Sequence, residues 1–188
     1  MGFVVFSCAT PAAAQAPRTL CDNLAAHPSD TQKMAPGIEQ ENYDIPAGRT
    51  ACAEAIKQYP NEGRFQYQYG CSYFYNAEYE AALPHFERTA ELGSAQGQLV
   101  LGLVVMGGTV GDPDECRAGR LWLSAARQNH LYSKIYLLQN WLDDMFEHYG
   151  LDLTQSEAED MLTRAEVLAT WDQARDDVAQ LRAGWVER

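Results

Sequence analysis

The side chains that most often carry chemistry are dispersed along this chain. It has four histidines, at His27, His85, His130 and His148. Zinc sites on helices commonly use two histidines that stand four residues apart, and no two of these have that spacing. We therefore predict no metal site, and we interpret each histidine as a surface or packing residue.

Two other kinds of site are disfavoured by their surroundings in the sequence. A catalytic cysteine needs a neighbouring base and a lowered pKa, whereas packing or a disulfide accounts for Cys71 in its helical segment. The glycines Gly107, Gly108 and Gly111 join two helical segments, so they are not the phosphate-binding loop that follows a strand. We predict no catalytic residue and no cofactor, and we expect that the protein is not an enzyme.

Acidic residues gather in two short stretches that resemble cation ligands at first sight. These are Asp112, Asp114 and Glu115, and then Asp143, Asp144 and Glu147. Neither stretch has the alternating ligand spacing of a calcium loop. Asp114 and Glu115 stand where a helix is predicted to begin, and the N-terminus of a helix attracts negative charge. We interpret both stretches as solvated surface.

The charge balance excludes nucleic acid as a partner. The 188 residues include 14 Lys plus Arg against 26 Asp plus Glu, which gives a formal net charge of −12. Phosphate backbones are bound by clustered Lys and Arg. The length corresponds to about one domain, and no window of about twenty apolar residues predicts a membrane-spanning helix.

Residues 1–16 differ from the rest of the chain and resemble an export signal. An apolar run from Gly2 to Ala9 precedes Ala14-Gln15-Ala16, and small residues three and one before a cut are typical of signal peptidase substrates. The basic segment that usually opens a signal is missing. We predict cleavage after Ala16, a periplasmic or secreted protein, and no membrane insertion after cleavage. A buried N-terminal strand and lipidation at Cys8 are the alternatives.

Removal of the signal leaves four cysteines, at Cys21, Cys52, Cys71 and Cys116. An even number in an oxidising compartment favours disulfides, and four cysteines allow three sets of pairs. Cys21 and Cys52 enclose a loop-rich segment, where a disulfide would stabilise the fold by roughly 3–4 kcal/mol. We favour Cys21–Cys52 and leave the pairing of Cys71 and Cys116 open.

The strongest pattern is a helical hairpin that occurs twice between residues 65 and 130. The first copy contains Tyr69-Gly70 and Thr89-Ala90, and the second contains Leu101-Gly102 and Ala125-Ala126. The apolar spacing predicts helices over 63–76, 79–92, 95–107 and 115–128. A repeat of roughly thirty-odd residues is typical of stacked helical hairpins.

A leader and a degenerate third hairpin complete the predicted organisation. Pro46 to Tyr59 predicts one helix in the leader, and Tyr132 to Phe146 predicts another after the second hairpin. A capping box at 156–159 opens a last helix, whose apolar stripe continues to Trp185. We predict a signal at 1–16, a leader at 17–62 and a repeat domain at 63–188. The predicted fold is all-α, a short solenoid of about three hairpins with a long C-terminal capping helix.

Several of these residues resemble a known family. Leu101-Gly102, Ala118, Trp122, Ala125-Ala126 and the loop at 107–108 resemble the Sel1-like repeat, a relative of the tetratricopeptide repeat, and residues 21–25 resemble the leader of exported bacterial members. The resemblance implies a right-handed superhelix in which the first helix of each hairpin lines a concave groove. The groove residues that it implies are Arg64, Tyr67, Gln68, Phe74, Tyr75, Leu103, Met106 and Gln139.

Together, the pattern and the resemblance favour a periplasmic scaffold or adaptor that binds a peptide or protein partner in this groove. The alternatives are a structural protein that self-associates through its last helix, and an accessory of a cell-envelope enzyme. The groove is either free or filled by the leader or the capping helix. The sequence does not identify the partner or the oligomeric state.

Overall fold

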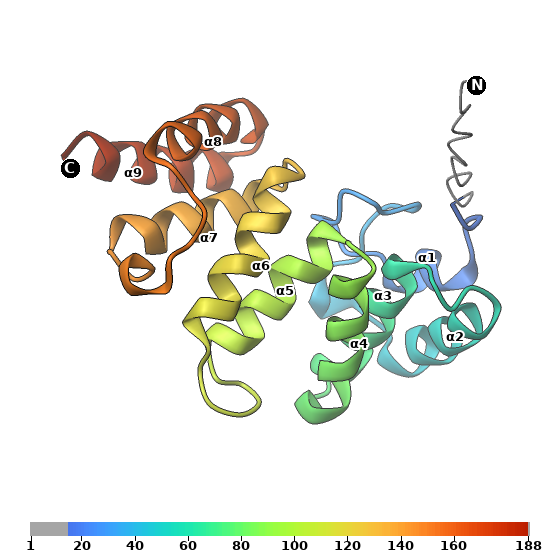
Figure 1. Cartoon of the computed structure of the whole chain (residues 1–188). Coiled ribbons are helices and arrows are strands. Elements are labelled where there is room, and N and C mark those ends of the chain that lie inside the picture. The colour runs from blue at the N-terminus through green and yellow to red at the C-terminus, as the bar shows by residue number, and fades with distance from the viewer. Residues whose placement is uncertain (1–14, 188) are drawn as a thin grey trace, which may run out of the picture.

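The computed structural model describes residues 15–187, so the predicted signal segment lies outside the described residues except for Gln15 and Ala16. Every regular element of the described residues is helical, as predicted. The helices run from α1 and α2 at one end of the molecule to α8 and α9 at the other (Figure 1). They are α1 (Leu20–Ala25), α2 (Ile45–Gln58), α3 (Gly63–Phe74), α4 (Tyr79–Glu91), α5 (Ala95–Met106), α6 (Glu115–Arg127), α7 (Leu131–Leu142), α8 (Gln155–Leu168) and α9 (Asp172–Glu187). Short 3-10 turns lie at Gln40–Asn42 and Glu147–Tyr149.

Three antiparallel hairpins, α3–α4, α5–α6 and α7–α8, form the solenoid that the spacing predicts. Four of their six helices begin at a polar side chain that accepts a hydrogen bond from a free backbone N–H group. Ser94 caps α5, Asp114 caps α6 and Thr154 caps α8, each through a side-chain oxygen. Local residues therefore set where the helices begin.

The first two hairpins close on the same contact between a glycine and an aromatic ring. A Cβ atom on Gly70 would lie 2.8 Å from the ring of Phe86, and one on Gly102 would collide with the indole of Trp122. Nε1 of Trp122 also donates to the carbonyl oxygen of Leu99 at 3.2 Å. The missing side chain lets the two helices approach closely enough to bury the ring.

The third hairpin lacks this glycine because the sizes are exchanged between its helices. Leu138 and Ala158 each follow their counterparts, Gly102 and Trp122, by the same number of residues. Both are fully buried in the same core. The first two hairpins have a small residue on the first helix and a large one on the second. The third hairpin has the large residue, Leu138, on its first helix and the small one, Ala158, on its second.

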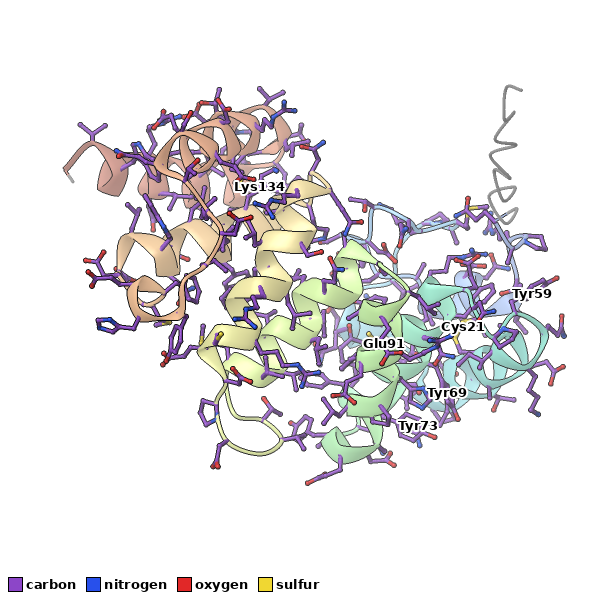
Figure 2. All side chains as sticks on the ribbon, in the orientation of Figure 1. Cys21, Tyr59, Tyr69, Tyr73, Glu91 and Lys134 are labelled. Atoms are coloured by element: carbon purple, nitrogen blue, oxygen red, sulfur yellow. A yellow bond between two sulfur atoms is a disulfide. The ribbon has the colours of Figure 1, made fainter. Side chains whose placement is uncertain are left out.

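The leader has its own small core, which is built around a disulfide. Cys21 in α1 and Cys52 in α2 are bonded, with an S–S distance of 2.00 Å, as we predicted (Figure 2). Ala25, Ala55 and Phe65 pack with the bridge. Cys71 and Cys116 are free. The leader contains α1 in addition to the single predicted helix.

The C-terminal segment differs from the prediction of one continuous helix. The chain leaves helical geometry at Ala169 (ψ 85°) and resumes it in α9, which folds back onto α7 and α8. Arg182 of α9 fastens the two helices through Glu159 and Glu166 of α8, at 2.6 and 2.7 Å. The third hairpin therefore ends with α8, and α9 is the cap.

Candidate partner-binding groove

A hollow of about 440 Å³ lies among the first helices of the three hairpins and the leader. Its apolar walls come from α3, α5 and α7, and include Phe74, Leu99, Val100, Leu103, Tyr132 and Tyr136. The leader contributes His27, Ser29 and Gln40. Segments that are far apart in the sequence therefore build one site.

Four of the eight residues that we predicted for the groove line this hollow. They are Tyr67, Phe74, Tyr75 and Leu103. Of the other four, Met106 is half-buried against the main core. Gln139 is exposed and lies in a separate shallow hollow beside Leu142 and Gln180. The repeat register thus predicts which helices face the groove. It predicts only some of the residues that line the open hollow.

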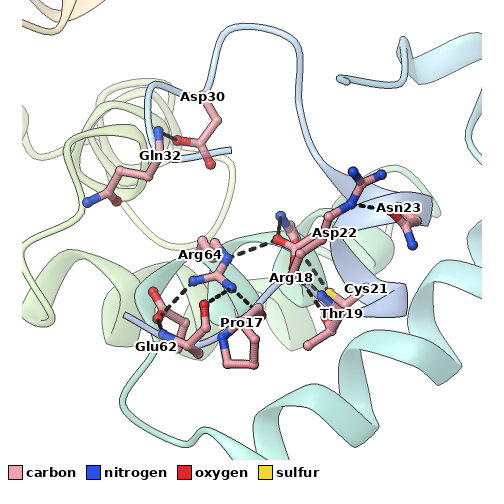
Figure 3. A network of polar contacts seen from close by, with 12 residues as sticks. Pro17, Arg18, Thr19, Cys21, Asp22, Asn23, Asp30, Gln32, Glu62 and Arg64 are labelled. Carbon is pink, nitrogen blue, oxygen red and sulfur yellow. Dashed lines mark hydrogen bonds and ion pairs between the residues drawn. The ribbon is translucent and has the colours of Figure 1, made fainter. Parts of the chain in front are cut away.

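The remaining two predicted residues, Arg64 and Gln68, are buried against the leader. Figure 3 shows the contacts of Arg64. Nε of Arg64 donates to Oδ1 of Asp22 at 2.9 Å, and its Nη2 donates to the carbonyl oxygens of Ala16 and Pro17, each at 2.9 Å. Nη1 lies 2.8 Å from Oε2 of Glu62. Arg64 therefore binds the chain's own leader.

Gln68 belongs to the same buried contact. Its Nε2 donates to Oδ1 of Asp22 at 3.4 Å, and its side chain touches Cys21 of the disulfide. The leader thus fills the end of the groove nearest α2. The hollow is the part that it leaves open.

A chain of buried hydrogen bonds runs behind the hollow. The backbone N–H of Ser133 donates to Nδ1 of His130 at 3.3 Å, so this ring carries its proton on Nε2. Nε2 then donates to Oε1 of Gln96 at 2.9 Å, and Nε2 of Gln96 donates to the Tyr67 hydroxyl at 3.0 Å. These hydrogen bonds fix the orientation of the Gln96 amide, and Gln96 lines the hollow.

Burial holds two titratable groups beside the hollow, His130 and Cys71, in their neutral forms. Burial lowers the pKa of His130 to about 4, with a further contribution from Lys134. Burial raises the pKa of the Cys71 thiol to about 12, although the hydroxyls of Tyr67 and Tyr75 oppose this shift. A protonated thiol is a poor nucleophile, so the site is suited to hydrogen bonding and apolar contact.

The sequence interpretation missed His27 of the leader and Tyr132 of the third hairpin, which also line the hollow. His27 packs edge-on against Tyr67, with ring centroids 6.4 Å apart, and Tyr132 extends the aromatic wall to Trp171, at 6.1 Å. A repeat register cannot identify His27, because it lies outside the repeats. Within residues 15–187, no three His, Cys, Asp or Glu side chains are grouped as metal ligands. No described helix is long and apolar enough to cross a bilayer.

Comparisons with known proteins identify the fold. No family model and no curated protein sequence matches the chain. A Sel1 repeat protein from Oxalobacter formigenes is similar in structure, with a TM-score of 0.56 and 17% identity over 69% of this chain and 52% of its own. A protective antigen of uropathogenic Escherichia coli with an SLR fold has a TM-score of 0.54 and 15% identity over 77% of this chain. This chain spans about half of the first protein and 34% of the second. The likeness confirms the predicted repeat architecture.

Proposed function

We propose that this chain, which has the Sel1-like repeat fold, is a protein-interaction module that binds a peptide segment of a partner in the hollow. The observation that carries the proposal is the hollow itself, an open site of about 440 Å³ with apolar walls on three consecutive hairpins. Ligand sites are commonly concave, apolar and equipped with a few polar groups. The rim supplies such groups, among them Gln40 and Tyr75.

The size of the hollow favours one or two side chains of an extended segment over a folded domain. It lies toward the small end of the range of ligand pockets, roughly 300–1,000 Å³. Half-buried walls such as Val100, Leu103 and Tyr136 are accessible to such a segment. Interfaces of this kind concentrate their binding energy in a few buried anchors.

Site-specific photocrosslinking tests the proposal. A benzophenone amino acid replaces Leu103 in the hollow, and in a matched control it replaces Glu80, which is exposed on α4. We expect a discrete crosslinked partner from position 103 that is absent from position 80. Filling the hollow with Val100→Trp should abolish that product. Equal crosslinking at both positions, or a product that survives Val100→Trp, would contradict the proposal.

We also propose that the chain is exported to the periplasm or secreted, which the small residues near its start and the disulfide support. Two hydrogen bonds of Ala16 favour a cleavage site upstream of this residue. The N–H of Ala16 donates to Oε2 of Glu62 at 2.9 Å, and its carbonyl accepts from Arg64. A cut after Ala16 would remove both bonds. A cut after Ala14, which has Ala12 two residues before it, keeps them.

Mass spectrometry of the exported protein distinguishes these outcomes. We expect a mature chain that begins at Gln15. A chain that retains Met1 would contradict export by cleavage, and one that begins at Pro17 would contradict the shifted cut.

Self-association through the last two helices is the second candidate function. Val167 and Val186 are 77% and 79% exposed, and Trp171 is 43% exposed. Burying such residues is a common basis for association. Light scattering on the purified protein tests this candidate. An oligomer that Val167→Glu dissociates would favour it, and a monomer at all concentrations would exclude it.

A further inference from the structure

The three helices that supply most of the wall of the hollow, α3, α5 and α7, offer a partner no accessible charge. Arg64 is the sole charged residue of α3, Lys134 is the sole one of α7, and α5 has none. Arg64 is buried in its ion pairs with Asp22 and Glu62. Lys134 is also buried, and its Nζ donates to the carbonyl oxygen of Ala126. The surface between the rims is therefore neutral.

The charged side chains near the hollow lie at two of its edges, and most of them are acidic. In the leader, the exposed Glu39 and Glu41 flank Gln40, which lines the hollow. In the loop between α5 and α6, Thr109 also lines the hollow, and the exposed Asp112 lies three residues after it. Lys33 is the sole cation of residues 28–44, and its Nζ lies 3.4 Å from the carbonyl oxygen of Asp30.

Glu39 is close enough to the hollow to influence its lining. Burial is the main cause that raises the pKa of Tyr75, and the negative charge of Glu39 adds to it. Burial lowers the pKa of His27, while Glu39 opposes that shift. The same carboxylate therefore acts on two groups of the rim. The net charge of −12 gives the whole molecule the same sign and favours encounters with cationic segments.

We infer that the partner segment carries one large apolar side chain flanked by lysine or arginine. The apolar side chain enters the hollow, and the flanking cations meet Glu39, Glu41 and Asp112 at its edges. This inference rests on the proposed function and adds the chemistry of the partner. Complementary charge at a rim raises the association rate and rejects partners of the wrong sign.

Binding of three labelled synthetic peptides to the full exported chain, with its disulfide intact, tests the inference. The first has a central leucine between lysines, the second has the same leucine between glutamates, and the third has serine between lysines. We expect the first to bind at least roughly tenfold more tightly than either of the others, with affinity that falls as salt rises. Fluorescence anisotropy measures all three.

Charge reversal at the rim provides the specific control. Glu39→Lys with Glu41→Lys should shift the preference toward the glutamate peptide. Glu80→Lys with Asp160→Lys changes the net charge equally at exposed positions on α4 and α8, and it should leave the preference in place. Leu103→Trp should abolish binding of every peptide.

The outcomes separate this inference from the proposed function. If the leucine peptides bind equally with either flank, and Leu103→Trp abolishes both, the inference is wrong and the proposed function stands. An unchanged preference after reversal at Glu39 and Glu41 also overturns the inference. If no peptide binds more tightly than it does to Leu103→Trp, both are wrong.

Discussion

Nε of Arg64 lies 2.9 Å from Oδ1 of Asp22, and neither side chain is exposed to solvent. The two residues belong to different parts of the protein, the first hairpin and the leader. Their contact joins the repeat domain to the segment that precedes it.

Removing one partner of this ion pair should destabilise the protein strongly. Asp22→Ala leaves a buried guanidinium without its main acceptor, and such changes cost about 3–5 kcal/mol. Urea unfolding measures the loss. Asp172→Ala removes the exposed acceptor of Arg175 in α9 and should have almost no effect. Equal effects of the two variants would show that the buried pair does not hold the leader.

Removing the disulfide should release the leader before it unfolds the hairpins. Cys21→Ser with Cys52→Ser opens a loop with a sequence separation of 31. The unfolded chain then gains conformational entropy, which lowers the free energy of unfolding by about 3–4 kcal/mol. We expect trypsin to cleave after Lys33 faster in this variant. Cys116→Ser removes a free cysteine and should change neither stability nor cleavage. Unchanged cleavage in the double variant would contradict this role of the disulfide.

Filling the glycine contact of the second hairpin should destabilise the solenoid. Gly102→Ala places a methyl group against the indole of Trp122, and overpacking of this kind costs about 1–3 kcal/mol. In Gly184→Ala the new Cβ lies 3.6 Å from Leu142, an ordinary contact. That variant should gain roughly 0.5–1 kcal/mol from its helical preference. Thermal unfolding compares the two, and a stable Gly102→Ala would show that the hairpin can open.

His130 should make stability depend on pH between about 4 and 6.5. Its folded pKa is lowered to about 4, mainly by burial, whereas the unfolded value is about 6.5. The unfolded chain therefore binds a proton that the folded chain excludes. This contribution is complete above pH 6.5 and is lost as the pH falls toward 4, with a slope of up to roughly 1.4 kcal/mol per pH unit.

The variant His130→Asn removes this titration and keeps a side chain that can cap α7. We expect urea unfolding at several pH values to give a flatter profile for it than for the wild type. The exposed His148 is the matched control, and His148→Asn should leave the profile unchanged. The same slope in His130→Asn and in the wild type would contradict a neutral buried imidazole.

The repeats were predictable because local residues determine them. The helices predicted over 79–92 and 115–128 end within one residue of α4 and α6, since a polar cap or a left-handed residue such as Gly93 bounds each of them. The disulfide followed from the number of cysteines and the loop between two of them. These signals act over a few residues or through one covalent bond.

The rest depended on contacts between distant segments. The Arg64–Asp22 pair joins residues 42 positions apart, and no local pattern distinguishes an arginine that faces a ligand from one that faces the leader. The break after α8 was missed because Ala169, Thr170 and Trp171 continue an amphipathic period without glycine or proline. Packing of α9 against α7 overrides that period.

The position of the hollow has a consequence for cooperativity. In a solenoid each repeat contacts only its neighbours, so stability is nearly a sum of local terms and the ends fray first. The hollow is lined by His27 of the leader at one end and by Tyr136 of the third hairpin at the other. A bound segment that touches both would bridge units that are not consecutive along the chain. At a free ligand concentration of one hundred times the dissociation constant, binding would add about 2.7 kcal/mol to the free energy of unfolding of the bridged units. The ligand would then make a series of loosely coupled hairpins unfold as a single unit.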